Sequence, residues 1–291
     1  MSLEETLGLI GFFRKAERVF KNVIGFRSVS LTEGNRTTYN SLNRVDAYAH
    51  MIDLLKPEQT MLCLLRTKPP LRKMLDIGVG GGRTTKYFAK LTEEYVGIDY
   101  SENMIRICHE KFRKYPRISF VTADARNLSI FEDNYFDFVL FSHGGLDAVE
   151  HEDRIRILHE IWRVAKGGGY FFFSTSNLDA MLQFCQIKLS THPKVLARNL
   201  IRLLLIRQLN PQMWKYTRGK RKDLNHTMFI IGADNWGLKT YCITPEAQVM
   251  QLKDSGFENI RTYDLQGEEI TGLPNTTDVE LHYLCTIKKR D

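Results

Sequence analysis

Glycines cluster at one point of this sequence, directly after a short apolar run. Residues 74–85 read MLDIGVGGGRTT, in which Asp76, Gly78, Gly80 and Gly82 have the spacing D-x-G-x-G-x-G. Glycine adopts backbone dihedrals that are closed to other residues, and it lets the main chain pass close to a bound molecule. The pattern therefore predicts a ligand-binding turn after a buried strand, with the ligand at the carboxyl end of that strand.

Other glycine-rich turns fit this spacing less well. Gly78 and Gly80 could open the G-x-G-x-x-G turn of dinucleotide-binding folds, but Arg83 occupies the place of the third glycine. A P-loop is excluded, because no Gly-Lys-Ser or Gly-Lys-Thr sequence follows. Two acids end later apolar runs, Asp99 in YVGIDYSENMI and Asp124 in FVTADARNL.

The elements that must position these residues alternate between strand and helix. Strands are predicted at 73–77, 95–98, 118–122, 136–141 and 170–174, and helices at 83–91, 102–114 and 153–165. A helix at 245–255 and strands near 257–265 and 279–287 follow a long interruption. Such alternation indicates an α/β fold, a mostly parallel sheet with helices on both faces.

Several segments together resemble one known family. D-x-G-x-G-x-G at the end of a first strand resembles motif I of the class I S-adenosylmethionine-dependent methyltransferases. FVTADARNL, FDFVLFSHGGLD and ILHEIWRVAKGGGYFFFSTSN resemble the segments that contain the third, fourth and fifth strands of that family. The resemblance covers about residues 70–177 and, more weakly, 245–291. It implies a Rossmann-like, seven-stranded, mostly parallel sheet, a helical cap or lid inserted after the fifth strand, and S-adenosylmethionine as cofactor, with S-adenosylhomocysteine as product.

The resemblance also implies which residues bind the cofactor. Asp99 would accept hydrogen bonds from both ribose hydroxyls, Asp124 would lie in the adenine-recognition segment, and Tyr100 and Met104 would border the adenine. Asp76 and Asp124 could instead be turn or capping residues, and Asp99 an exposed acid at a strand end. Tyr100 and Met104 could equally be packing residues. The implied set is Asp76, Gly78, Gly80, Gly82, Asp99, Tyr100, Met104, Asp124, Ala125, Ser142 and His143.

Catalysis by such a protein requires few groups, because the cofactor's sulfonium already makes the methyl group electrophilic. A hydroxyl or protonated amine acceptor must also lose a proton, which favours a general base. His143 after the fourth strand and His226 in the interruption are candidate bases, since histidine titrates near neutrality. Asp147 is a further candidate. A structural, hydrogen-bonded role is the alternative for each.

Absent motifs narrow the acceptor. The loop after the fourth strand reads FSHGG, without the D/N-P-P-Y/F pattern of base-amine methyltransferases and without a Pro-Cys nucleophile. We therefore expect a small-molecule acceptor, methylated on oxygen or nitrogen, and no nucleic acid substrate. The basic interruption keeps an RNA or protein methyltransferase open as an alternative. A protein that binds S-adenosylmethionine without catalysis is a second alternative.

The chain divides into four predicted parts. These are an N-terminal helical cap (1–70), the S-adenosylmethionine-binding core (71–177), a helical and basic lid insertion (178–244) and the C-terminal part of the core sheet (245–291). The insertion contains NLIRLLLIRQL and KYTRGKRK, and we expect it to cover the acceptor rather than bind the cofactor. The cations that would attract an anionic acceptor are Lys215, Arg218, Lys220, Arg221 and Lys222.

Composition bounds the class of protein. With 291 residues, 43% hydrophobic and 26% charged, the chain is expected to be globular, and its net charge of +7 permits an anionic partner without requiring one. Its five cysteines are widely spaced and form no C-x-x-C, which favours reduced thiols and no metal site. The N-terminus lacks the order of a secretory signal, and no apolar run is long enough to span a membrane. A cytoplasmic location is therefore expected.

Overall fold

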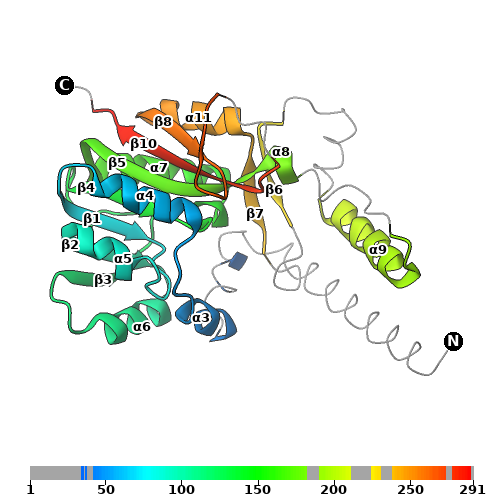
Figure 1. Cartoon of the computed structure of the whole chain (residues 1–291), viewed down its shortest axis with the longest axis horizontal. Helices are drawn as coiled ribbons and strands as arrows, with labels where there is room; N and C mark the ends of the chain where they lie inside the picture. The colour runs from blue at the N-terminus through cyan, green and yellow to red at the C-terminus, as the bar shows by residue number, and fades with distance from the viewer. Residues whose placement is uncertain are drawn as a thin grey trace.

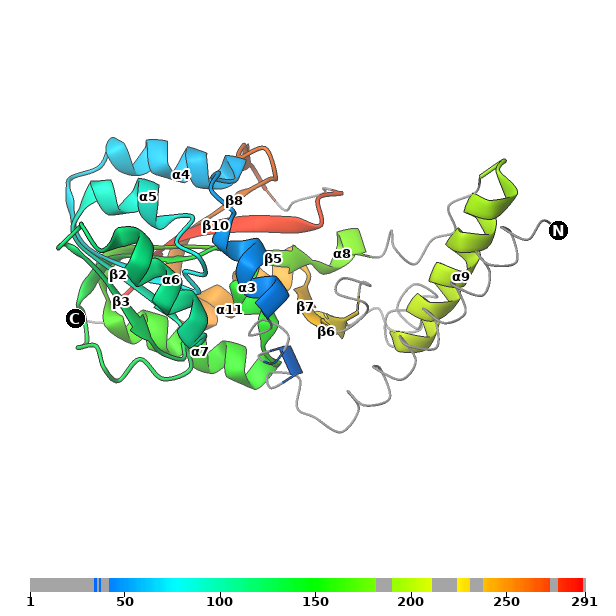
Figure 2. The same ribbon diagram turned by 90° about the horizontal axis from the view of Figure 1, so that it is seen from below.

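The computed structural model describes residues 34–35, 37, 42–181, 190–210, 224–230, 238–272 and 277–289. Its strands form one twisted sheet with helices on both faces (Figures 1 and 2). The strands are β1 (Leu71–Ile77), β2 (Thr92–Asp99), β3 (Ile118–Thr122), β4 (Phe136–Phe141), β5 (Ala165–Asn177), β6 (His226–Phe229), β7 (Thr240–Ile243), β8 (Phe257–Tyr263), β9 (Glu269–Ile270) and β10 (Glu280–Ile287). The helices are α3 (Leu42–Ala49), α4 (Lys56–Arg66), α5 (Thr85–Phe88), η1 (Ala89–Leu91), α6 (Glu102–Phe112), η2 (Gly145–Ala148), α7 (His151–Val164), α8 (Leu178–Met181), α9 (Pro193–Leu209) and α11 (Pro245–Asp254).

The sheet order places the predicted ligand-binding turns at one edge. The strands follow the order β3-β2-β1-β4-β5-β10-β8-β9, and neighbours from β3 to β5 are parallel. β10 is antiparallel to both β5 and β8. The chain order reverses between β1 and β4, which is where open α/β sheets bind ligands. Since β10 runs the other way, its first residues lie at the same edge as the ends of β1, β4 and β5.

Alternating side chains of the strands fill two cores, one on each face. Phe171 and Phe173 of β5 belong to the core covered by α7 and α11, with Ile157 and Leu252 among its members. Phe172, between them, belongs to the core covered by α4, α5 and α6. Both faces are apolar because a strand projects successive side chains to opposite sides. This burial on both faces confirms the α/β prediction.

Among the described residues, this sheet has ten strands, three more than the seven predicted. β9 is a two-residue strand that pairs with β8, too short to leave a pattern in the sequence. β6 and β7 form a hairpin within the predicted insertion, and β7 pairs in parallel with the end of β5. The insertion is therefore not wholly helical. The predicted helix at 83–91 is also shorter, since α5 covers four residues and continues as a 3-10 turn.

The insertion packs on the core through its own small cluster. Leu178 and Met181 of α8 contact Ile206 of α9, Phe229 of β6 and Cys242 of β7. Figures 1 and 2 show α9 projecting from this side of the molecule. The basic segment 215–222, residues 1–33 of the predicted N-terminal cap and Cys185 lie outside the described residues.

Two helices of the N-terminal part lie close to the β1 turn. α3 ends at Ala49 and α4 begins at Lys56, with Pro57 in the first turn of α4. α4 packs on the sheet through Met61, Leu62 and Leu65. Within the residues that the structure describes, no helix is both long and apolar enough to cross a membrane.

Candidate active site

The glycine turn after β1 requires its glycines for two different reasons. Gly78, Gly80 and Gly82 have φ angles of +65°, +53° and +79°, which L side chains rarely adopt. Gly81 is required by space, because a Cβ there would lie 2.6 Å from the carbonyl oxygen of Tyr48. Sequence reasoning did not select Gly81, since its constraint comes from α3, which is distant in the sequence.

Lys111 fastens this contact between α3 and the glycine turn. Its ammonium group donates hydrogen bonds to the carbonyl oxygens of Gly81, at 2.8 Å, and of Ala49, at 2.5 Å. Tyr48 and Met51, at and after the end of α3, then line the pocket above the turn. The N-terminal part thus contributes side chains to the site.

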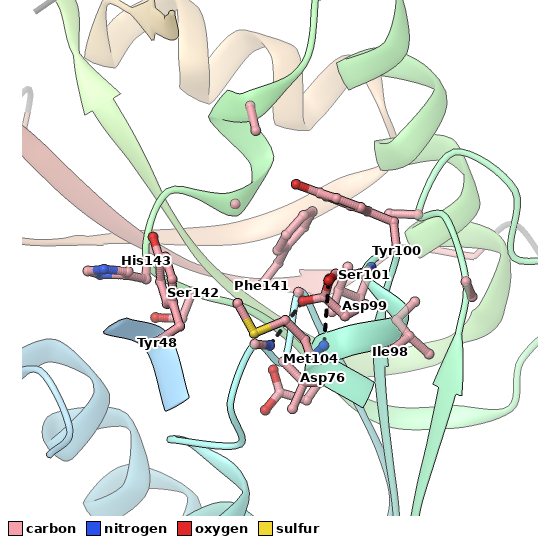
Figure 3. Close-up of a pocket in the computed structure, with 18 of the residues that line it drawn as sticks. Tyr48, Asp76, Ile98, Asp99, Tyr100, Ser101, Met104, Phe141, Ser142 and His143 are labelled. Carbon is pink, nitrogen blue, oxygen red and sulfur yellow. Dashed lines mark hydrogen bonds between the residues drawn. The ribbon is translucent and has the colours of Figure 1, made fainter. Parts of the chain in front are cut away.

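Asp99 organises the turns after β1 and β2. One of its carboxylate oxygens accepts a hydrogen bond from the backbone N–H of Gly80 at 3.0 Å, and the other accepts from Ser101 N–H at 2.9 Å (Figure 3). Burial raises the pKa of this carboxyl, and the two N–H groups oppose the rise. Ser101 caps α6 by accepting from the N–H of Met104. One acid therefore couples the glycine turn to the start of α6.

Asp76 is a buried acid whose carboxylate has hydrogen-bond partners within the fold. It is 2% exposed, and its carboxylate accepts hydrogen bonds from the hydroxyls of Thr84 and Tyr95. Burial raises the pKa of Asp76 to about 6, against the lowering effect of those two hydroxyls. Asp76 therefore tethers the end of β1 to β2 and α5.

These turns surround one pocket at the carboxyl edge of the sheet (Figure 3). Of the predicted cofactor-binding residues, only Gly82 is not in its lining; a Cβ there would meet Phe112 at 2.6 Å. The others all line this pocket: Asp76, Gly78, Gly80, Asp99, Tyr100, Met104, Asp124, Ala125, Ser142 and His143.

Asp124 reaches the pocket as part of an ion-pair network. Its carboxylate accepts from the backbone N–H of Arg126 at 2.9 Å and from the guanidinium of the same residue at 2.7 Å. Arg126 also pairs with Asp153 of α7 at 2.9 Å. Asp124 is therefore both a turn residue and a pocket residue. The structural role and the cofactor-binding role that the sequence left as alternatives are compatible.

A buried ion pair closes the pocket on the side of α4, and sequence reasoning missed it. Glu58 is fully buried and forms a bidentate pair with Arg83, whose Nη2 lies 2.7 Å from Oε1. The hydroxyl of Ser142 donates to the same carboxylate, and the N–H of Leu55 donates at 2.7 Å. Burial raises the pKa of Glu58, but these partners outweigh it and hold the pKa below its usual range.

The partners of Glu58 join α4, the glycine turn and the loop after β4. The sequence carried part of the signal, since Pro57 and Glu58 are typical of a helix's first turn. Arg83, which occupies the place of the third glycine of a dinucleotide motif, has Glu58 as its structural partner.

The two candidate histidines lie in different places. His143 lines the pocket in a left-handed conformation, with φ of +59°, and its ring meets that of Tyr48 edge-on at 6.1 Å. His226 does not line the pocket. Its ring centroid lies 4.0 Å from that of His151, which hydrogen-bonds to Tyr241 at 2.7 Å. Burial, His151 and Arg154 lower the pKa of His226 to about 4.

Asp147 has a structural partner. It pairs with the fully buried Arg154 at 2.8 Å and accepts from the N–H of Ser176 at 2.7 Å. Arg154 donates further hydrogen bonds to Gln248, Gln251 and Thr175. These contacts join the loop after β4 to α7, β5 and α11.

Comparison with known proteins matches the same core. Residues 75–173 match the model of the methyltransferase domain family. Residues 75–173 therefore form a methyltransferase domain. Among curated proteins, a demethylmenaquinone methyltransferase of Staphylococcus saprophyticus is 37% identical to this chain over 100 residues. That match spans 33% of this chain and 41% of the relative, and a Staphylococcus aureus counterpart is 38% identical over a similar span.

Solved structures share the fold of the methyltransferase domain and more of the chain around it. An S-adenosylmethionine-dependent methyltransferase of Methanosarcina mazei covers 78% of this chain and 98% of its own, with TM-score 0.53 and 20% identity. The 1,6-didemethyltoxoflavin N1-methyltransferase of Burkholderia thailandensis, solved with its substrate and S-adenosylhomocysteine, covers 89% of this chain and 88% of its own, with TM-score 0.54 and 13% identity. At these identities the likeness establishes the fold, a Rossmann-like sheet flanked by helices.

Proposed function

We propose that this protein binds S-adenosylmethionine in the pocket above the glycine turn and transfers its methyl group to a small molecule. The observation that carries the proposal is the coupling of Asp99 to Gly80 beneath that pocket. The turn offers bare backbone at Gly78 and Gly80, and Asp99 lies beside it with a carboxylate that can accept hydrogen bonds from hydroxyls.

Each part of the bound molecule has a chemically suitable neighbour. Asp99 would bind the ribose hydroxyls, while Met104 and Ala125 would border the adenine and Asp124 would lie at its edge. The glycine turn and the Ser142–His143 segment would hold the methionine end. When bound, the cofactor supplies an electrophilic methyl group, and the chain's residues orient the acceptor and exclude water.

A small acceptor is favoured over a macromolecule. The pocket is covered from one side by Tyr48 and Met51 of the N-terminal part, and Asn35 reaches into its lining. The side chain of Asn35 also donates to the carbonyls of Ala148 and Lys239 at 2.9 Å each, which joins that part to the loop after β4 and to β7. Two relatives whose names state a small acceptor, demethylmenaquinone and 1,6-didemethyltoxoflavin methyltransferases, share the core or the fold.

Calorimetry on the full chain tests the cofactor. S-Adenosylmethionine and S-adenosylhomocysteine are expected to bind, and NAD is not, because Arg83 stands where a dinucleotide turn needs its third glycine. NAD binding without S-adenosylmethionine binding would refute the proposal. Incubation with methyl-labelled cofactor and fractionated metabolite extracts then tests the acceptor, and label in RNA or protein alone would contradict a small acceptor.

A further inference from the structure

At the edge of the sheet where the pocket lies, two polar side chains have buried atoms without a hydrogen-bond partner among the described residues. His282 of β10 is 0% exposed, and among the described residues neither of its ring nitrogens has a hydrogen-bond partner. Oε1 of Glu280, two residues earlier on the strand, is buried and equally unpartnered. A polar group buried without a partner costs free energy, and such groups often mark a functional site.

The two side chains form a pair. Glu280 and His282 project from the same face of β10, and Nε2 of His282 lies 3.8 Å from Oε1 of Glu280. This separation is longer than a hydrogen bond, but a movement of less than about 1 Å would form one. His282 stacks on Phe172, with ring centroids 5.9 Å apart, so its ring plane is fixed from one side.

This pair lies next to the loop that lines the pocket. His282 is directly opposite Ser174 in the sheet, and the hydroxyl of Ser174 accepts a hydrogen bond from the N–H of Gly144 at 2.8 Å. Gly144 follows Ser142 and His143, both of which line the pocket. The side chain of Glu280 is 25% exposed, so it can be reached from outside the core.

Among the described residues, the other charged groups that act on Glu280 already have partners. Its charged neighbours are Glu58 and Arg83, which neutralise each other, and Asp147, which pairs with Arg154. His282 faces Glu58, Arg83, His143 and Asp264. Burial raises the pKa of Glu280 to about 7 against hydrogen bonding from Ser174, and burial lowers the pKa of His282 to about 4.

We propose that Glu280 receives the hydrogen-bond-donating group of the acceptor, a hydroxyl or an amine N–H, with His282 positioning its carboxylate. This inference rests on the proposed function, and it names the acceptor class and the proton acceptor. Glu280 is the catalytic residue in this assignment, and His282 is a positioning residue.

The proposed step balances as a methyl transfer. A lone pair of the acceptor's oxygen or nitrogen forms the bond to the methyl carbon, and the electrons of the carbon–sulfur bond return to sulfur. The proton of the acceptor group passes to the carboxylate of Glu280. A base whose pKa lies near the working pH is suited to this transfer.

The experiment uses the full chain loaded with S-adenosylhomocysteine. Calorimetry first establishes that wild type, Glu280→Gln and the control Glu268→Gln bind S-adenosylhomocysteine within threefold of one another. Glu268 is an exposed acid in the turn before β9, outside the site. Failure of the wild type to bind would refute the proposed function itself, whereas equal binding by all three proteins isolates the acceptor question.

Three probes then replace the unidentified acceptor: phenol, 2-phenylethylamine, and methoxybenzene, which lacks the donor. The amide NMR signals of Leu281 and Tyr283, which flank the pair, should shift with phenol or with 2-phenylethylamine but not with methoxybenzene. The responding probe distinguishes a hydroxyl site from an amine site. Glu280→Gln should weaken that binding about tenfold, as expected for loss of a charge-assisted hydrogen bond, and Glu268→Gln should not.

The pH dependence separates positioning from simple structure. Binding of the responding probe should weaken as the pH falls through about 7, the pKa to which burial raises Glu280, and Glu280→Gln should lose this dependence. His282→Phe keeps the stack on Phe172 but removes the nitrogens, and it should move the midpoint upward. Donor probes that leave the β10 signals unmoved, or bind wild type and Glu280→Gln alike, would overturn the inference while leaving the cofactor proposal intact.

Discussion

The two halves of the site are built differently. In the cofactor half, formed by β1, β2, β3 and the turns that follow them, the acids already have partners: Asp76 accepts from two hydroxyls and Asp99 from two backbone N–H groups. In the acceptor half, where β4, β5 and β10 end or begin, Glu280 and His282 keep buried unpartnered atoms among the described residues. The first half is set before any ligand binds, whereas the second still has hydrogen bonds to make.

This difference agrees with the two tasks proposed for the site, binding of the cofactor and binding of the acceptor. A site for one invariant molecule gains from being fixed in advance, because ordering it on binding would cost free energy. In our proposal, the acceptor half has its polar groups on elements outside the matched methyltransferase domain. Here those elements are α4, with Glu58, and β10, with Glu280 and His282, and both lie outside the matched segment 75–173.

The largest expected effect comes from breaking the support of the acceptor half. Asp147→Ala leaves the guanidinium of Arg154 buried without its carboxylate, so the free energy of unfolding should fall by about 3–5 kcal/mol. Urea denaturation measures this change. Asp133→Ala removes the partner of Arg163 at a similar distance, but Asp133 has a side chain 66% exposed, and its loss should cost less than about 1 kcal/mol. Equal losses would mean that burial does not distinguish the two pairs.

The next effect concerns pH and the cofactor half. Burial raises the pKa of Asp76 from 3.8 to about 6, so the fold favours the protonated acid by about 3 kcal/mol. This contribution is complete below pH 3.8 and is lost as the pH rises through about 6. Asp76→Asn resembles the protonated acid, and its oxygen can accept from both Thr84 and Tyr95.

The stability of Asp76→Asn relative to wild type should therefore increase between pH 4 and pH 7.5, by at most about 3 kcal/mol. Urea denaturation across that range measures the difference directly. Taking the difference removes the opposing contribution of His282, whose lowered pKa destabilises both proteins in acid. A stability difference that stays constant across this pH range would show that the fold does not raise the pKa of Asp76.

Asp99→Ala sharpens the comparison at the ligand itself. The change removes the acceptor for the N–H groups of Gly80 and Ser101 as well as the proposed ribose contact. Loss of a hydrogen bond to a charged group costs about 1.5–3 kcal/mol, which weakens S-adenosylmethionine binding by about one to two orders of magnitude. Calorimetry measures it, and Asp99→Asn, which keeps one acceptor oxygen, should lose less. Undiminished affinity in Asp99→Ala would remove Asp99 from the site.

The sequence predicted which residues of β1, β2 and β3 would lie together far better than it predicted the contacts of α4 and β10. The glycine turn, Asp99 and Asp124 each follow a strand within a contiguous segment, so local pattern and strand order sufficed to bring them to one edge. The sequence did not predict a role for Gly81 or Glu58, because their constraints come from contacts between distant parts of the chain. Gly81 contacts Tyr48, and Glu58 contacts Arg83 and Ser142. No short-range pattern records such partners.

The same reason explains the candidates for catalysis. His143 was predicted at the pocket because it follows a strand end, and it lines the pocket. His226 lies in a β-hairpin beside His151 and Tyr241, and its part in catalysis stays a prediction. Glu280 and His282 lie at the start of an antiparallel strand near the chain's end. The pairing of β10 with β5 places them beside Ser174, which bonds to the loop after β4.

The smallest expected effect is that of the insertion on the cofactor half. Removing all of 212–240 would also remove β6 and the first residue of β7, which belong to the sheet, so that deletion would damage the fold.

Replacing 211–223 with a Gly/Ser linker of equal length keeps Asn210, whose amide bonds to both the N–H and the carbonyl of Ile230. It removes Lys215, Arg218, Lys220, Arg221 and Lys222. Because the residues proposed to bind the cofactor, Asp99 among them, lie outside 211–223 in the sequence, S-adenosylmethionine affinity measured by calorimetry should change by less than tenfold, under about 1.4 kcal/mol. Turnover of the native acceptor should fall sharply if this segment covers the acceptor half, and unchanged turnover by the folded variant would show that it does not.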